Sequence, residues 1–300
     1  MKPTSVIFLV VSVLLIIGGM ITCSVAKDIA ITDSYTLFSD TENGGTYTRH
    51  DFDSAEINKI ELLVSDAEIN VYGGAEQSYI EFYNFRDGMH TVSTAGKTIS
   101  LDEIPDLKSL FDFSSGFSFS GLRYFLRSDT KDLGPKKVNI YLDTAASLKI
   151  LSIEADNCTV NMEKIYAQFD LVLESTGDVA FHANDYRSAS GLTIHAQNLD
   201  FTMFSGYVHS LSLSADRMQA DAQELFFDTA SLDAHSGVLR IHTSSPLTRF
   251  RYDVRGSGTF LLEESVTALP YVRQPEESEE EAFFTADLGS ASLNLSGLRE

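Results

Sequence analysis

The feature that most constrains the fold of this chain is a repeat of about 20 residues between residues 151 and 245. Five blocks follow one another at steps of 20, 21, 19 and 19 residues, and their first residues are Leu151, Leu171, Leu192, Leu211 and Ala230. The third residue of each block is also apolar and the fifth is small, whereas the residues between them are mostly polar. Alternate residues of a strand point to opposite faces, so each block opens with a strand that has one buried face and one wet face.

Each block continues with a polar corner and a second apolar alternation. Asp156-Asn157 and Thr176-Gly177 are two such corners, and Asn, Asp and Gly suit tight turns because they tolerate left-handed backbone or bond their own main chain. In the first block the alternation after the corner is Cys158, Val160 and Met162. A period near 20 with strands inside each period is typical of a β-solenoid. The sequence therefore predicts an all-β fold with one coil per block.

The first 27 residues predict a targeting or anchoring segment. Lys2 precedes an apolar run of 18 residues from Val6 to Cys23, which is just long enough to cross a bilayer as a helix. We favour a retained transmembrane anchor. A cleaved signal peptide and a lipoprotein modified at Cys23 are the alternatives. All three place residues 28–300 outside the cytoplasmic membrane, and the anchor predicts a single-pass membrane protein.

The rest of the chain divides by its pattern. Residues 28–56 are polar and predict a linker with a possible cap strand, and residues 57–300 predict the solenoid. An aromatic-rich insert at 83–136 interrupts the repeat. It either folds over the solenoid and buries its Phe residues, which we favour, or exposes them to a partner or membrane. The glutamate-rich segment 275–282 predicts a solvated acidic loop.

Charge and cysteine content limit the functional classes. The net charge of −21 argues against nucleic acid and against anionic lipid headgroups as ligands. The two cysteines lie in the apolar N-terminal run and at Cys158, so they predict no disulfide, and Cys158 fits an inward core position. The histidines fall at unrelated repeat positions and form no metal-ligand spacing. We expect no cofactor.

One candidate site is a row of polar residues at the fourth position of the blocks. This Glu/His/Asp row consists of Glu154, Glu174, His195, Ser214 and Asp233. Neighbours in stacked coils lie roughly 5 Å apart, which is close to the carboxylate separation in retaining glycosidases. The row is either a sugar-cleaving site or, as we favour, an ordinary wet face.

A second candidate is a ladder of aromatic residues. The sixteenth positions of four blocks form this aromatic ladder: Tyr166, Tyr186, Tyr207 and Phe226. If the rings point inward, they form a stacked core row, which we favour. If they point outward, they offer a platform for sugar rings or for a partner. The sequence leaves both orientations open.

The segments Ile57–Val71 and Val138–Met162, with the glycine-punctuated strands after them, resemble the bacterial "putative adhesin" β-strand-repeat family, a domain of unknown function (DUF4097). The resemblance covers most of residues 57–300. It implies a single-stranded, right-handed parallel β-solenoid, often behind a membrane segment at the cell envelope. The family has no known catalytic residues to transfer.

Together these features predict a non-catalytic binding, adhesion or structural module of the bacterial envelope. Its partner is expected to be an envelope protein or a glycan, and its N-terminal helix is expected to hold it in the membrane. Two alternatives remain: a polysaccharide-acting enzyme that uses the Glu/His/Asp row, and a component that senses envelope stress.

Overall fold

The structure is a computed structural model that describes residues 39–40, 46–85, 90–103, 134–143, 147–166, 168–274 and 282–297. These residues form one 16-stranded, mostly parallel sheet and are all-β apart from a single 3-10 turn at Leu247–Arg249. The predicted N-terminal anchor, the Phe-rich part of the insert and the glutamate run lie outside the described residues. No helix in the part of the chain that is described has the length and apolarity needed to cross a membrane.

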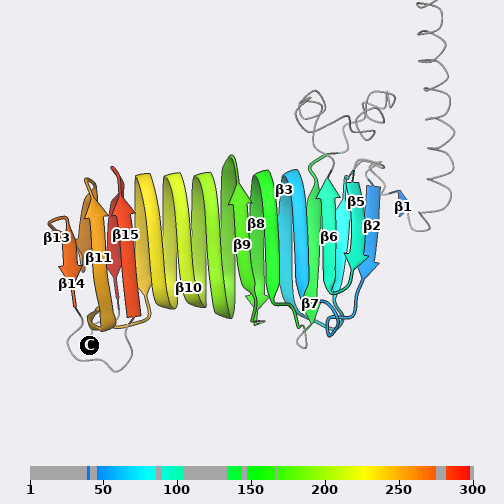
Figure 1. The fold of residues 1–300 in the computed structure, drawn as a ribbon, viewed down its shortest axis with the longest axis horizontal. Coiled ribbons are helices and arrows are strands. Elements are labelled where there is room, and N and C mark those ends of the chain that lie inside the picture. Colours follow the sequence, from blue (N-terminus) through cyan, green and yellow to red (C-terminus); the bar gives the residue numbers. More distant parts are fainter. Residues whose placement is uncertain are drawn as a thin grey trace, which may run out of the picture.

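Four elements form the parallel centre of the sheet: β3 (Lys59–Ala75), β8 (Ile150–Ile165), β9 (Asp170–Ser175) and β10 (Asp178–Thr243). Figure 1 shows β10 as successive windings that lie side by side along the long axis of the molecule. From β8 onward, paired residues are separated by about one repeat, whereas β3 pairs with β8 across the intervening insert. Leu151 pairs with Leu171, and Leu171 with Leu192. Like positions of neighbouring blocks therefore lie on one another.

Strands in both parallel and antiparallel pairings cover the N-terminal end of this centre. β3 is flanked on one side by β8 and on the other by two groups of strands. The first group is the hairpin β5 (His90–Ala95) and β6 (Thr98–Glu103). The second runs outward through β7 (Lys137–Asp143), β4 (Tyr79–Tyr83), β2 (Thr46–Asp51) and β1 (Ser39–Asp40). The predicted insert therefore begins with strands of the same sheet.

The C-terminal end is built out of sequence order. β15 (Ala282–Leu288) and β16 (Ser292–Ser296) pair with β10 on one side. On the other side they pair with β11 (Phe250–Gly256) and β12 (Thr259–Leu262), which come earlier in the chain. The short strands β13 (Ser265–Thr267) and β14 (Tyr271–Arg273) then close this end in antiparallel pairings.

The core is one continuous apolar interior, and the repeat pattern explains it. The first and third residues of all five blocks are buried, and so are Ala155, Ala215 and Ala234 among the small fifth residues. Phe181 and Phe201 stack in this interior with ring centroids 5.3 Å apart. The prediction that Cys158 belongs to the core is confirmed, since this free cysteine is buried.

A second corner recurs once per winding and fixes which residues turn inward after it. Four non-glycine residues at this corner have positive φ: Lys164, Asp185, Ser205 and Glu224. Such residues are uncommon, and their recurrence at one place marks a structural requirement. The residue that follows each of them is buried: Ile165, Tyr186, Gly206 and Leu225.

Candidate functional site

The Glu/His/Asp row lies outward, as predicted, and three of its members are neighbours. Glu154 of β8 pairs with Glu174 of β9, and Glu174 pairs with His195 of β10. All three side chains are exposed and line one side of an open groove of about 580 Å³. Asp233 is also exposed, but it pairs with Asp287 of β15 and lies outside this groove.

The geometry of Glu154 and Glu174 does not match that of a glycosidase. Retaining enzymes place two carboxyl groups on either side of the scissile bond, so that one attacks the sugar while the other protonates the leaving group. Glu154 and Glu174 project side by side from adjacent strands of one face. Neither side chain makes a hydrogen bond within the described residues. The two glutamates are therefore solvent-exposed like charges on one face of the sheet.

A Ser-Lys-Glu cluster adjoins this groove. The Lys136 ammonium donates to the Ser65 hydroxyl at 2.6 Å and to a Glu103 carboxylate oxygen at 2.5 Å. The other oxygen of Glu103 accepts from the backbone N–H of Ser65 at 2.9 Å and from its hydroxyl at 3.1 Å. A nucleophilic serine needs a neutral base beside it. Here the lysine forms an ion pair with Glu103 at 2.5 Å, so the cluster acts as a clamp that ties β3 and β6 to the residue before β7.

The aromatic ladder is not continuous, because Tyr186 does not belong to it. Tyr166 is 54% exposed, and Tyr207 and Phe226 are half-buried, whereas Tyr186 is fully buried. The reason is one extra residue at the corner before Val179, which pairs with Cys158 at a separation of 21 residues rather than 20. Tyr186 consequently pairs with Ile165 and not with Tyr166. The prediction of one aligned ladder was wrong at this position. The inward orientation that we favoured was also wrong for Tyr166, Tyr207 and Phe226, because these rings are exposed or half-buried on the outer face.

Arginines complete the outer row instead. Arg187 follows Tyr186 in sequence, and its guanidinium lies 6.0 Å from the centre of the Tyr166 ring. At the other end, the Arg249 guanidinium lies 4.9 Å from the centre of the Phe226 ring and pairs with Asp228 at 2.8 Å. These cation–π contacts stabilise the outer row, by about 0.5–1 kcal/mol each at exposed sites. Alignment of the blocks by residue position did not predict that these two arginines lie beside the aromatic rings.

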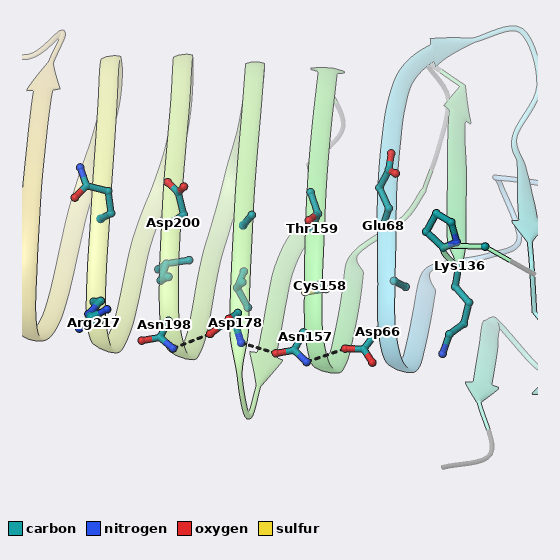
Figure 2. A pocket seen from close by; sticks show the side chains of 17 residues that line it. Asp66, Glu68, Lys136, Asn157, Cys158, Thr159, Asp178, Asn198, Asp200 and Arg217 are labelled. Atoms are coloured by element: carbon teal, nitrogen blue, oxygen red, sulfur yellow. Dashed lines mark hydrogen bonds between the residues drawn. The ribbon is translucent and has the colours of Figure 1, made fainter. Parts of the chain in front are cut away.

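A groove of about 950 Å³ runs along the first corner of the windings (Figure 2). Its floor is a ladder of corner side chains. Asn157 donates to Asp66 at 2.7 Å, Asn198 donates to Asp178 at 2.6 Å, and the backbone N–H of Asp178 donates to Asn157 at 2.8 Å. These groups satisfy one another, so we interpret the ladder as a device that stacks the corners at a fixed spacing.

A further candidate site is a cluster of five half-buried tyrosines at the N-terminal end of the sheet, which the sequence analysis did not predict. The tyrosine cluster consists of Tyr47, Tyr72, Tyr79, Tyr83 and Tyr141. The Tyr141 ring stacks between two others, with centroids 5.0 Å from Tyr72 and 4.3 Å from Tyr79. The guanidinium of Arg49 covers the Tyr79 ring at 3.7 Å from its centre.

One carboxylate organises the other half of the tyrosine cluster. Glu81 accepts hydrogen bonds from the hydroxyls of Tyr47 and Tyr83, each at 3.0 Å. Partial burial and this hydrogen bond to Glu81 raise the pKa of Tyr83, so its phenol remains a donor at physiological pH. The spacing Tyr79, Glu81, Tyr83 was the available signal, since alternate residues of a strand share a face. The contact with Tyr141 was not readable, because the predicted insert separates the two segments.

Comparisons with known proteins identify only distant structural neighbours. No family model matches the chain, and no curated protein sequence is similar to it. A "putative cell adhesion protein" from Clostridium sporogenes is 9% identical with a TM-score of 0.41, over 85% of this chain and 100% of that one. Two proteins from Parabacteroides distasonis each match 84% of this chain. They are a "putative adhesin" (9% identity, 96% of its length, TM-score 0.37) and a "putative lipid binding protein" (11% identity, 97%, TM-score 0.39).

Proposed function

We propose that this chain is a non-catalytic binding module displayed on the outer side of the cytoplasmic membrane in a bacterial envelope. In this proposal residues 57–300 are a single-stranded, right-handed β-solenoid of the DUF4097 kind, with coils of about 20 residues. Residues 1–27 anchor it as a single-pass membrane protein. Parallel pairing at one repeat length supports the solenoid, and the 18-residue apolar run supports the anchor.

The observation that carries the binding function is the tyrosine cluster. Aromatic residues and arginine are enriched in recognition surfaces, because they offer large contact areas with polar tips at a low entropic cost. Here five of the chain's twelve tyrosines and Arg49 gather over β2, β4, β7 and β3, all half-buried or exposed. Stacking fixes their rings before any ligand arrives, so that little side-chain freedom is lost on binding.

Sedimentation with insoluble, lipid-extracted bacterial envelope material tests this proposal. The full chain should sediment with the material, and Tyr79→Ala or Tyr141→Ala should reduce the bound fraction severalfold. Tyr166→Ala removes a more exposed tyrosine that lies outside the tyrosine cluster, and this control should bind like wild type. Equal binding by all four proteins, or no binding by wild type, would contradict the proposal. Thermal melts of each variant check that the fold is retained.

Envelope polysaccharide cleavage is the alternative function, and the side-by-side geometry of Glu154 and Glu174 argues against it. We expect the purified chain to release no reducing ends from envelope polysaccharide. Release that is abolished in Glu154→Gln or Glu174→Gln would move the protein into the enzyme class, because an amide keeps the shape of the side chain but cannot act as a nucleophile or acid.

The proposed location has a separate test. Protease added to intact cells, with the wall removed where needed, should degrade residues 28–300. Degradation that occurs only after lysis would contradict the outward location.

A further inference from the structure

A groove adjoins the tyrosine cluster and leads away from it across the strands. Its volume is about 570 Å³, and Tyr72 of the tyrosine cluster lines one end. Phe204, which is 48% exposed, also lines it. An exposed phenylalanine contributes little to the core. Tyr72 and Phe204 line the same groove, so we ask whether both rings contact one ligand.

The two rings face the same short row of strands. Tyr72 pairs with Glu163, and Glu163 pairs with Asn184. Phe204 follows one repeat after Asn184, so three strand spacings, about 14 Å, separate Tyr72 from Phe204. Tyr141 covers one face of the Tyr72 ring at 5.0 Å and 24°, which leaves the opposite face toward the groove. The rings thus bracket a slot with a defined length.

The polar groups between the rings are not used by the protein. His182, Asn184 and Thr202 line the groove and make no side-chain hydrogen bond within the described part of the chain. By contrast, Asn161 at the edge of the groove donates to Asn70 at 2.8 Å, and Asn70 donates to Asn139 at 2.9 Å. The structure therefore satisfies the amides at one end of this row internally, and it leaves His182, which pairs with Asn161, and the polar residues beyond it available to a ligand.

The charge of the groove argues against an anionic ligand. The described residues that line the groove include no arginine or lysine that could hold an anion, and the one carboxylate among them, Glu163, is paired with Lys164 at 3.4 Å. The chain as a whole carries a net charge of −21, which repels polyanions. A neutral ligand with flat apolar faces and hydroxyl edges fits this combination. Pyranose sugars have both, and a sugar unit is about as long as one strand spacing.

We propose that this groove binds a linear, neutral polysaccharide, about four sugar units of which lie across the strands from Tyr72 to Phe204. The inference rests on the proposed binding function and names the class of its ligand. The two aromatic rings contact the C–H faces of the terminal units. Asn184, His182 and Thr202 bond the hydroxyls of the units between them.

Calorimetric titration with defined oligosaccharides tests the proposal. The probes are cello-oligosaccharides and chito-oligosaccharides of two to six units, with oligogalacturonates as the anionic comparison. The full chain is kept in solution by a detergent whose headgroup contains no sugar. Affinity for at least one neutral series should rise up to three or four units and then level off, and the oligogalacturonates should bind at least tenfold more weakly.

The variants locate the site. Tyr72→Ala and Phe204→Ala should each weaken binding at least tenfold, and Asn184→Ala severalfold, while Tyr166→Ala, outside the tyrosine cluster, binds like wild type. No binding to either neutral series, or binding unaffected by the loss of Phe204, overturns the proposal. Phe204 is exposed, so its replacement leaves the core intact and the fold can be checked by a melt.

Failure of this inference is distinguishable from failure of the proposed function. Envelope material treated with protease should still retain the chain if the ligand is a polysaccharide. If the untreated material retains the chain and the treated material does not, the ligand is a protein, so the glycan assignment fails while the binding function stands. If neither preparation retains the chain, both proposals fail.

Discussion

Replacing Gly237 with alanine should test how closely the windings of β10 are stacked. Gly237 lies at a corner, with φ of +125°, a conformation that residues with a side chain rarely adopt. A Cβ at this position would lie 1.9 Å from the carbonyl oxygen of Met218 and 2.8 Å from its carbonyl carbon. Met218 is 19 residues earlier, one winding away, and its backbone belongs to the sheet, so it cannot move aside as a side chain could.

The structure gives the magnitude as the sum of two costs. The unfavourable φ costs about 1–3 kcal/mol, and the overlap with a fixed neighbour costs about 1–3 kcal/mol more. We therefore expect Gly237→Ala to lower the free energy of unfolding by about 4 kcal/mol. Gly96→Ala is the matched control, because Gly96 has φ of +61° but no atom within 4 Å of its ideal Cβ. This control should cost only about 1–2 kcal/mol, the price of the left-handed backbone.

Urea unfolding of the full-length variants, followed by circular dichroism, measures the difference. Stacked repeats can unfold in parts, so the two variants are compared only if their m-values agree with that of the wild type. Hydrogen exchange adds a local measurement, and Gly237→Ala should accelerate exchange around residues 216–218 and 235–239. If Gly237→Ala is no more destabilising than Gly96→Ala, the windings are not in contact at this corner and the stacked arrangement is refuted there.

Three further predictions follow from burial. Tyr186→Ala should lower the free energy of unfolding by about 3–5 kcal/mol. Tyr166→Ala, which loses the contact with Arg187, should lower it by only about 0.5–1 kcal/mol in the same unfolding experiment. Equal costs would mean that both rings lie on the same side of the sheet. Burial raises the pKa of the Cys158 thiol to about 12, so in a Cys23→Ser background a thiol reagent at pH 8 should label the chain only at the rate of unfolding. Burial also raises the pKa of Tyr186 and Tyr252. Their phenols ionise near pH 10 only in the unfolded chain. The contribution of these two groups to the free energy of unfolding should therefore be constant below pH 10 and fall above it. Phenolate absorbance should appear together with unfolding.

The inward half of the fold was predictable, because it depends only on alternation within a block. Leu151, Leu171, Leu192 and Leu211 are buried as the period-2 pattern predicts. Burial of alternate residues is set by the pleat, and a few residues of sequence are enough to read it.

The aromatic ladder was not predictable by counting, because a single residue changes the outcome. Blocks that are aligned at their first residues differ by one residue after the corner at Thr176-Gly177. Since neighbours along a strand point to opposite faces, a one-residue offset exchanges an inward residue for an outward one. The corner absorbs the extra residue, and the sequence alone does not show which corner does so. Tyr186 is buried and Arg187 outward for this reason.

The tyrosine cluster could not be predicted from the sequence for a different reason. Tyr72 and Tyr141 are neighbours through the pairing of β3 with β7, and Tyr79 reaches Tyr141 through the pairing of β4 with β7. Neither pairing occurs at the repeat distance, and one of them is antiparallel. A periodic pattern predicts contacts only between like positions of successive blocks, so contacts made by the strands that cover the N-terminal end have no signal in it.

This difference explains why the candidate binding groove lies where the two kinds of pairing meet. Within the regular windings, each outward row places like positions of neighbouring strands side by side at the strand spacing, as in the row of Glu154, Glu174 and His195. At β3 the row that contains Glu163 and Asn184 continues into Tyr72, where the covering strands add stacked rings to its end. The corner ladder that includes Asn157 and Asp178 holds the windings at a fixed spacing. A slot between Tyr72 and Phe204 is therefore set in length by the backbone before a ligand binds, and a ligand that repeats at the strand spacing gains from every winding it crosses.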